Sequence, residues 1–305
     1  MPTPLNLHFT PIAKETNQIY KKNFLPITGI IAITSVVGLL LVKYIPTWLG
    51  FAEVTVDQGE YSFELMNMFG DNSGLLSNVS FAVIVMIGLS LLGELIDQLG
   101  TGGIVHFCTR DQKGKPSTIA ESLQFGVQNI AKLITLMIQV FIYTWAWLPI
   151  GVTLILIIGV SLSILPEAAL VFLPIAVIVG FLAIIKRLLS AVFATPLFFM
   201  QENPDSTKAL ETSIAASKNI LGTIFSNYFV LSLILGIAGV VISVVVAVAS
   251  PMLQELADFG MILYDILTLI PAVLIAAYAS VFSYVFAKEA HSVASPSEPT
   301  ASPAS

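Results

Sequence analysis

Six long runs of apolar residues alternate with shorter polar segments along the chain. A helix needs about 20 apolar residues to cross a hydrocarbon core of about 30 Å, and it satisfies its own backbone hydrogen bonds in lipid. The pattern therefore predicts an all-α, polytopic membrane protein with six transmembrane helices. We place these helices at residues 24–42, 81–99, 133–160, 168–188, 220–248 and 261–287.

Lysine and arginine residues are distributed unevenly around these runs. Twelve of the 13 lie within the first 23 residues, directly after the last run, or at the connections that follow the second and fourth runs. Lys43 is the exception. Basic residues near the ends of a span resist translocation and mark cytoplasmic connections. Both termini are therefore predicted to be cytoplasmic, and the acidic connections on the other side to be external.

The chain is predicted to form one membrane domain over residues 1–290. Residues 291–305 are rich in serine, alanine and proline. Such a composition cannot supply a packed core, so we expect a disordered cytoplasmic tail.

Composition agrees with a membrane protein and excludes several other classes. The chain is 56% hydrophobic and 10% charged, with a formal net charge of −6. A nucleic-acid-binding protein needs a concentrated basic face, so nucleic acid is not an expected partner. The single Cys108 and three separated histidines match no metal-ligand spacing, and we expect neither a metal nor a cofactor.

An internal repeat is visible where glutamate precedes serine or threonine. This dipeptide occurs three times, each time with an asparagine seven residues after the hydroxyl residue and an apolar run directly behind it. The pattern predicts three units, each made of an amphipathic helix followed by a transmembrane hairpin. The repeated residues are Glu15, Thr16 and Asn23; Glu121, Ser122 and Asn129; and Glu211, Thr212 and Asn219.

The segment before each asparagine has helical spacing of apolar residues, which predicts a helix lying on the bilayer surface. The apolar positions are Ile12 and Ile19 in the first unit, Ala120, Leu123, Val127 and Ile130 in the second, and Leu210, Ile214 and Leu221 in the third. The hydroxyl and the asparagine share one helix face. We interpret them as capping or packing residues, with a shared ligand site as the alternative.

Charged residues at the predicted cytoplasmic ends of spans two and four form the candidate interaction surface. They are Glu94, Asp97, Arg110, Lys113, Lys115 and Arg187. Anionic headgroups attract such basic side chains, so membrane lipids are the expected partners. Glu94 and Asp97 could alternatively act as an acid and a base, because they share a helix face. Pairing with Arg187 or nearby lysines is the preferred interpretation.

A transport function is a second possibility for the six-span protein. Asp265 lies in the last span, and Pro271 follows it. Ionisable residues and broken helices within spans are typical of transporters. Pro149 and Gly151 in the third span, and Pro174 and Gly180 in the fourth, could also bend helices. Proline kinks are also ordinary in membrane helices.

Two segments resemble a known bacterial family. The stretch from Lys186-Arg187 through Pro196 to Ala209-Leu210-Glu211-Thr212-Ser213 resembles the central motif of YciC-like inner-membrane proteins and of the membrane domain attached to some glycerophosphodiester phosphodiesterases. Glu15-Thr16 to Lys22-Asn23-Phe24 is similar to the opening of YciC-like chains. The resemblance implies a multi-span protein of the bacterial plasma membrane and supplies no catalytic residues.

These observations favour a non-enzymatic membrane component that interacts with lipids or membrane partners, whose identity stays open. A small-solute transporter or channel is the alternative, and a lipid-acting membrane enzyme is the third choice. We do not transfer phosphodiesterase activity from the resemblance, because no soluble hydrolase domain is expected here.

Overall fold

The computed structural model describes residues 7–41, 53–57, 60–64, 75–146, 166–254 and 257–294. Most of these residues are helical; the others form one short hairpin and the connections between helices. The helices are α1 Phe9–Lys22, α2 Phe24–Leu39, α4 Leu75–Gln112, α5 Ile119–Gln128, α6 Ile130–Trp145, α8 Pro166–Ala191, α9 Ala194–Met200, α10 Ser206–Ser217, α11 Leu221–Gln254 and α12 Ala257–Ala294.

Each predicted span overlaps one of the long helices, namely α2, α4, α6, α8, α11 or α12. Within the described residues, three helical segments are long and apolar enough to cross a membrane: Val177–Met200, Leu221–Val241 and Thr268–Ala294. The number rises to five if each of two bent helix pairs is one span. Such helices are typical of a membrane protein.

The two bent pairs lie where the sequence repeat predicts a change of direction. Helix α1 meets α2 at 87°, and α5 meets α6 at 63°. One asparagine separates the helices of each pair, Asn23 in the first and Asn129 in the second. The amphipathic segments are thus helices distinct from the apolar ones that follow them.

A two-stranded antiparallel hairpin lies between α2 and α4, which an all-α prediction did not include. Strand β1 is Glu53–Asp57 and β2 is Glu60–Glu64, with Val54 paired to Phe63 and Val56 to Tyr61. The sequence alternates β-branched or aromatic residues with polar ones, and Gly59 follows the first strand. Both features favour a hairpin.

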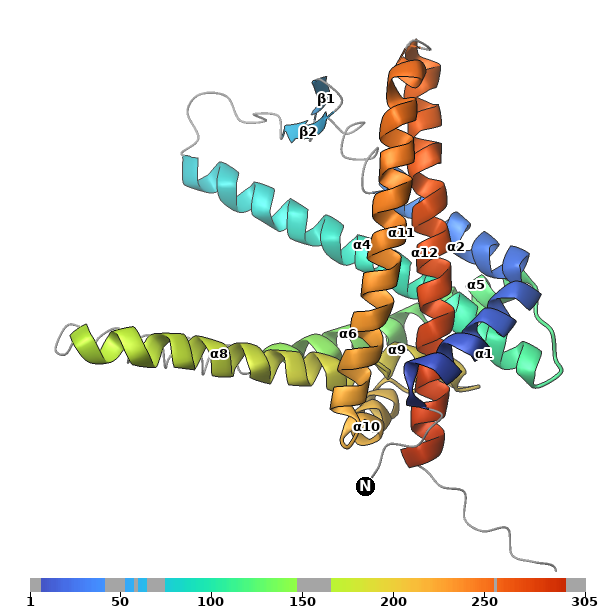
Figure 1. Ribbon diagram of the computed structural model, residues 1–305, viewed down its shortest axis with the longest axis vertical. Coiled ribbons are helices and arrows are strands. Elements are labelled where there is room, and N and C mark those ends of the chain that lie inside the picture. Colours follow the sequence, from blue (N-terminus) through green and yellow to red (C-terminus); the bar gives the residue numbers. More distant parts are fainter. Residues whose placement is uncertain are drawn as a thin grey trace, which may run out of the picture.

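The long helices diverge from a common centre. Figure 1 shows α4, α8 and the side-by-side pair α11–α12 extending from this region in different directions. Helices α1, α5, α9 and α10 lie around the centre, where α9 packs against α4, α10 and α12. We call this central region the junction.

Aromatic side chains fill the junction. Phe193, Phe198, Phe199 and Phe286 are at most 1% exposed. The rings of Phe193 and Phe286 meet edge to face, with centroids 5.0 Å apart. Burial of large aromatic rings supplies much of the packing energy of such a core.

The outer parts of the helices instead expose large apolar side chains. Examples are Phe181 on α8 and Val240 on α11, which are 62% and 65% exposed. Soluble monomers rarely expose large contiguous apolar patches. These exposed apolar surfaces are suited to contact with lipid, whereas the side chains of the junction pack against one another.

Close helix packing at the junction depends on glycines of α4. A Cβ added to Gly100 would lie 2.6 Å from Oγ1 of Thr34 on α2. A Cβ on Gly102 would overlap the Phe199 ring, and one on Gly103 would lie 3.0 Å from Ile30. Small residues let membrane helices approach closely. This role was not predicted from the sequence.

Two predictions need correction. Ile12 was expected to rest on the bilayer, but it is 1% exposed and belongs to the buried core. Its helix packs against α12, so protein rather than lipid covers that face. The tail was predicted to start at residue 291, but helix α12 continues to Ala294. Residues 295–305 lie outside the described part of the chain.

Candidate functional site

A basic cavity lies beside the end of α4, between that helix, α5 and the end of α9. Its volume is about 300 Å³. It brings together three of the basic residues selected from the sequence. The lining residues are His106, Thr109, Arg110, Lys113, Lys115, Phe125, Phe199, Met200, Gln201 and Glu202.

The end of α4 positions the basic side chains. Gly114 has a φ of 68°, a left-handed conformation that glycine adopts without strain. The Lys115 N–H donates to the carbonyl of Arg110 at 2.9 Å, and the Gly114 N–H to that of Asp111 at 3.1 Å. This pair of hydrogen bonds is the Schellman helix ending. It folds Lys115 back beside Arg110, whose Nε also donates to the Lys115 carbonyl at 3.3 Å.

Helix α5 starts directly after this turn. Thr118 is its N-cap and Glu121 completes a capping box, since each side chain accepts from the backbone N–H of the other residue. Glu121 therefore has a local structural role here. The sequence carried this signal in the spacing of Thr118 and Glu121, but we interpreted Glu121 through the repeat.

The cavity wall combines aromatic and polar groups. The His106 ring stacks on Phe125, with centroids 4.0 Å apart. Burial lowers the pKa of His106, and the positive charge of Arg110 lowers it further. His106 is therefore neutral at pH 7, and the charge of the cavity comes from Arg110, Lys113 and Lys115.

One acidic residue faces these cations. Nζ of Lys113 lies 3.2 Å from Oε1 of Glu202, in the connection after α9. The hydrogen bond from Lys113 lowers the pKa of the Glu202 carboxyl, and the charges of Lys113, Lys115 and Arg110 lower it further. Lys113 is the cavity cation that pairs directly with Glu202 in the described part of the chain.

The other predicted surface residues lie elsewhere. Glu94 and Asp97 are exposed on α4, and Asp97 is about 20 Å along the helix axis from Arg110. Glu94 accepts a hydrogen bond from Gln98 at 2.6 Å. Arg187, on α8, donates to the Tyr143 carbonyl and lies over the Tyr143 ring, 4.9 Å from its centroid. The predicted surface is therefore divided over three places.

The repeated asparagines have structural partners at the first two bends. Nδ2 of Asn23 donates to Oδ2 of Asp111 at 3.1 Å, where Nζ of Lys22 also donates at 2.8 Å. Nδ2 of Asn129 donates to the Phe125 carbonyl at 2.9 Å. Each bond ties a bend to a neighbouring helix or helix end. This supports the structural interpretation of the asparagines.

The hydroxyl residues of the repeat are fully buried in the first two units. In the third unit, neighbouring serines are fully buried instead of the repeat residue. Thr16 and Ser122 are fully buried, and Ser122 shares a hydrogen bond of 3.1 Å with Ser117. In the third unit the fully buried hydroxyl residues are Ser213 and Ser217, which donate to the Ser190 carbonyl at 2.8 and 3.3 Å. Thr212 is half-buried. These contacts favour packing over a shared ligand site.

The repeated glutamates also differ from one another. Glu15 forms an ion pair of 2.6 Å with Lys288 of α12, whereas Glu121 caps a helix and Glu211 is exposed. The first contact fixes α1 against the end of α12. The repeat therefore preserves helix positions more than side-chain chemistry.

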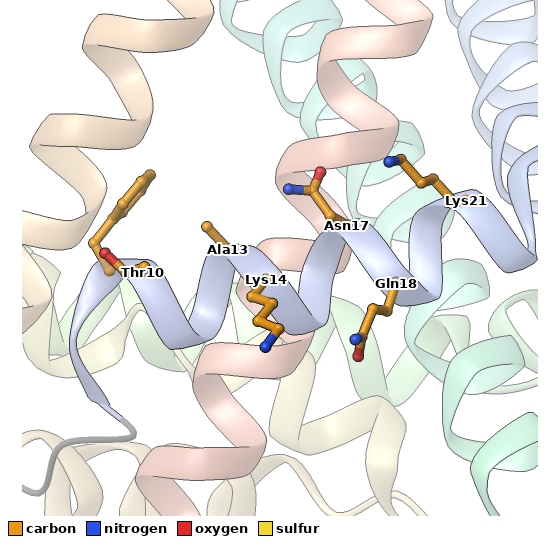
Figure 2. Close-up of a pocket in the computed structure, with 7 residues that line it drawn as sticks. Thr10, Ala13, Lys14, Asn17, Gln18 and Lys21 are labelled. Atoms are coloured by element: carbon orange, nitrogen blue, oxygen red, sulfur yellow. The ribbon is translucent and has the colours of Figure 1, made fainter.

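The polar face of α1 forms a second, shallow hollow. Figure 2 shows Thr10, Lys14, Asn17, Gln18 and Lys21 along this face of one helix. Lys14 and Lys21 are exposed. They make suitable controls for the basic cavity, because they carry the same charge at a different place.

Side chains able to bind a metal do not cluster in the described ranges. No group of three or more His, Cys, Asp or Glu residues able to hold a metal occurs there. Cys108 is buried, and this burial raises the pKa of its thiol to about 12. The thiol is therefore unreactive at neutral pH. The side chain of Asp265, and residues Pro149 and Gly151, lie outside the described part.

Comparisons of the chain with models of protein families, with curated proteins and with solved structures gave no match. The similarity to YciC-like proteins rests on the two sequence segments alone and stays a prediction. Any functional conclusion therefore depends on the chemistry of the basic cavity.

Proposed function

We propose that the chain is a non-enzymatic, six-span component of a bacterial plasma membrane that binds an anionic phospholipid headgroup in the basic cavity. In this proposal both termini are cytoplasmic, and three repeated units of amphipathic helix plus hairpin build the domain. The bends at Asn23 and Asn129 support the repeat. The two similar segments support a relationship to YciC-like membrane proteins.

The observation that carries the proposal is the meeting of Arg110, Lys113 and Lys115 at one cavity. The single carboxylate of Glu202 pairs with Lys113 and offsets only part of the charge of three neighbouring cations, so a further anion is favoured there. Arginine and lysine are also the side chains that bind phosphate groups most often. A phosphate group therefore matches the charge of the cavity.

The apolar part of the lining suits a lipid. Phe125, Phe199 and Met200 lie beside the basic residues. A phospholipid presents a phosphate next to a glycerol and the first carbons of the acyl chains. The cavity therefore offers charged contacts for the phosphate and apolar contacts for the glycerol and the first acyl carbons.

The predicted orientation would place the cavity at the cytoplasmic leaflet, where anionic lipids are present. All three cations follow the second apolar run, in a connection that the positive charges mark as cytoplasmic. Anionic lipids attract basic groups at this surface by about 1 kcal/mol per residue. Salt screens such an attraction, so lipid retention should fall as ionic strength rises.

The triple variant R110Q/K113Q/K115Q is expected to lose most of its copurified anionic lipid. The control K14Q/K21Q/K218Q removes the same charge at exposed positions outside the cavity. Native mass spectrometry of both proteins, purified in a mild detergent, measures bound lipid directly. We expect the control to retain anionic lipid as the unsubstituted protein does.

Two results would reject the proposal. Equal lipid loss in both variants would show that only total charge matters. Full retention in the cavity variant would place the lipid elsewhere. Size-exclusion chromatography should show both variants folded, because the substituted side chains are at the surface of the protein and none belongs to its buried core.

A further inference from the structure

The three amphipathic helices of the repeat follow one packing order. Helix α5 packs against α2 and α4, and α10 packs against α6 and α8, so each lies on the pair of long helices that precedes it in the chain. Helix α1, the first of the three, packs against α12 of the last pair, as Figure 1 shows. The first unit thus covers the third, and the order of packing closes on itself.

Polar contacts hold α1 along its whole length. At its start, Nδ2 of Asn227 on α11 donates to the Leu7 carbonyl at 2.8 Å. In its middle, Oε1 of Glu15 lies 2.6 Å from Nζ of Lys288 on α12. At its end, the two hydrogen bonds to Asp111 described above tie it to α4. Helix α1 therefore connects the last pair of long helices to the first.

Apolar burial accompanies these polar contacts. Leu7 and Ile12 are at most 1% exposed. The Phe9 ring faces the ring of Phe282 on α12, with centroids 5.6 Å apart. Removing such side chains from water favours the docked position of α1. The same burial leaves an apolar surface on α12 that α1 must cover.

Two features favour release of α1 from this position. Asn23 alone separates α1 from α2, and the two helices meet at 87°, so α1 can turn about a single residue. Oγ1 of Thr16 is buried and has no hydrogen-bond partner among the described residues. An unpaired buried hydroxyl lowers the stability of the docked state, because water would satisfy it after release.

We propose that α1 is a releasable strap, which closes the three units into a ring by docking on the last pair of long helices of its own chain. In the docked state it fixes α11 and α12 to the end of α4. In the released state α1 unfolds, since a helix of 14 residues is marginal on its own in water. The inference rests on the proposed division into three units and not on the proposed headgroup binding.

Hydrogen exchange of the full-length protein in detergent tests the release. Amides of α1 should exchange faster than those of residues 284–287 of α12, which are at most 1% exposed, because α1 opens while the junction stays folded. E15Q and K288Q should each speed the exchange of α1 about threefold. The double variant should have about the same effect as either single one, because both remove one interaction.

T16V separates the strap from general destabilisation. Valine has nearly the shape of threonine and no hydroxyl, so this variant should slow the exchange of α1 about fivefold. T212V changes the corresponding, half-buried residue of α10 and should leave α1 unaffected. The proposal is wrong if α1 exchanges as slowly as residues 284–287, or if T16V fails to slow its exchange.

Crosslinking tests whether the ring closes within one chain. E15C/K288C, treated with a short bifunctional maleimide, should give an internally linked monomer, detected by mass spectrometry after proteolysis. E15C and K288C chains that are expressed together should give no linked dimer. Such a dimer, or the absence of the internal link, would overturn closure within the chain. R110Q/K113Q/K115Q should leave the internal link intact, so loss of lipid and loss of the strap are separate results.

Discussion

Gly102→Ala is expected to destabilise the protein by about 1–3 kcal/mol, because it overpacks the junction. The new methyl group would overlap the ring of Phe199. That ring is 1% exposed and has the Phe198 ring edge to face against it, with centroids 5.0 Å apart. It therefore has little room to move. The midpoint of thermal unfolding in detergent measures the loss.

Gly88→Ala on the same helix is the matched control. No atom lies within 4 Å of a Cβ added to Gly88. Alanine favours helix over glycine by about 1 kcal/mol, so this variant should be neutral or slightly more stable. Phe199→Leu combined with Gly102→Ala should recover part of the stability. A Gly102→Ala protein as stable as the control would refute this packing.

Thiol labelling of single positions is expected to give an all-or-none pattern that reports the membrane sides. The native Cys108 is buried, and its thiol pKa of about 12 makes it a silent background. Gln124→Cys, exposed on α5, should react with an impermeant maleimide in inverted vesicles and not in intact cells. Gln58→Cys, in the acidic connection, should show the reverse.

Denaturation supplies the control for labelling. Cys108 should react only after the protein is unfolded at alkaline pH, which verifies that the reagent and the protein are competent. Labelling of Gln124→Cys in intact cells would place the basic cavity outside and remove its access to the cytoplasmic leaflet. Labelling of both positions from one side would contradict the six-span topology.

Local sequence rules predicted the positions of helices and bends well. Long apolar runs coincide with α2, α8, α11 and α12 because the length and composition of each are enough to specify a helix. Asn23 and Asn129 were found through the repeat, and both separate two helices. The asparagine of the second bend bonds within the repeat, to the Phe125 carbonyl, whereas Asn23 bonds to the distant Asp111, so the local pattern located both bends but did not show the partner of the first.

Long-range packing could not be read from the same pattern. Ile12 has the spacing of a lipid-facing residue, yet α12 lies against its helix. An amphipathic helix presents the same apolar face to lipid or to protein, and the sequence does not distinguish them. The role of Gly102 was missed for the same reason, because its neighbour Phe199 is distant in sequence.

The candidate site was predicted in part. Arg110, Lys113 and Lys115 are close in sequence, and the helix ending at Gly114 keeps them close in space. Arg187 was grouped with them because of its expected membrane side, but it contacts Tyr143 in another helix pair. Glu202 was not selected, since no local pattern links it to Lys113.

A photo-crosslinking residue at Met200 tests the location of the headgroup most directly. Met200 lines the basic cavity, whereas Phe229, a control position on α11, is 60% exposed. We predict that position 200 captures anionic phospholipid in excess of its share of the membrane, and that R110Q/K113Q/K115Q abolishes this excess. Position 229 should capture lipids in their bulk proportions. Bulk proportions at position 200, or an excess that survives the triple substitution, would contradict headgroup binding in the cavity.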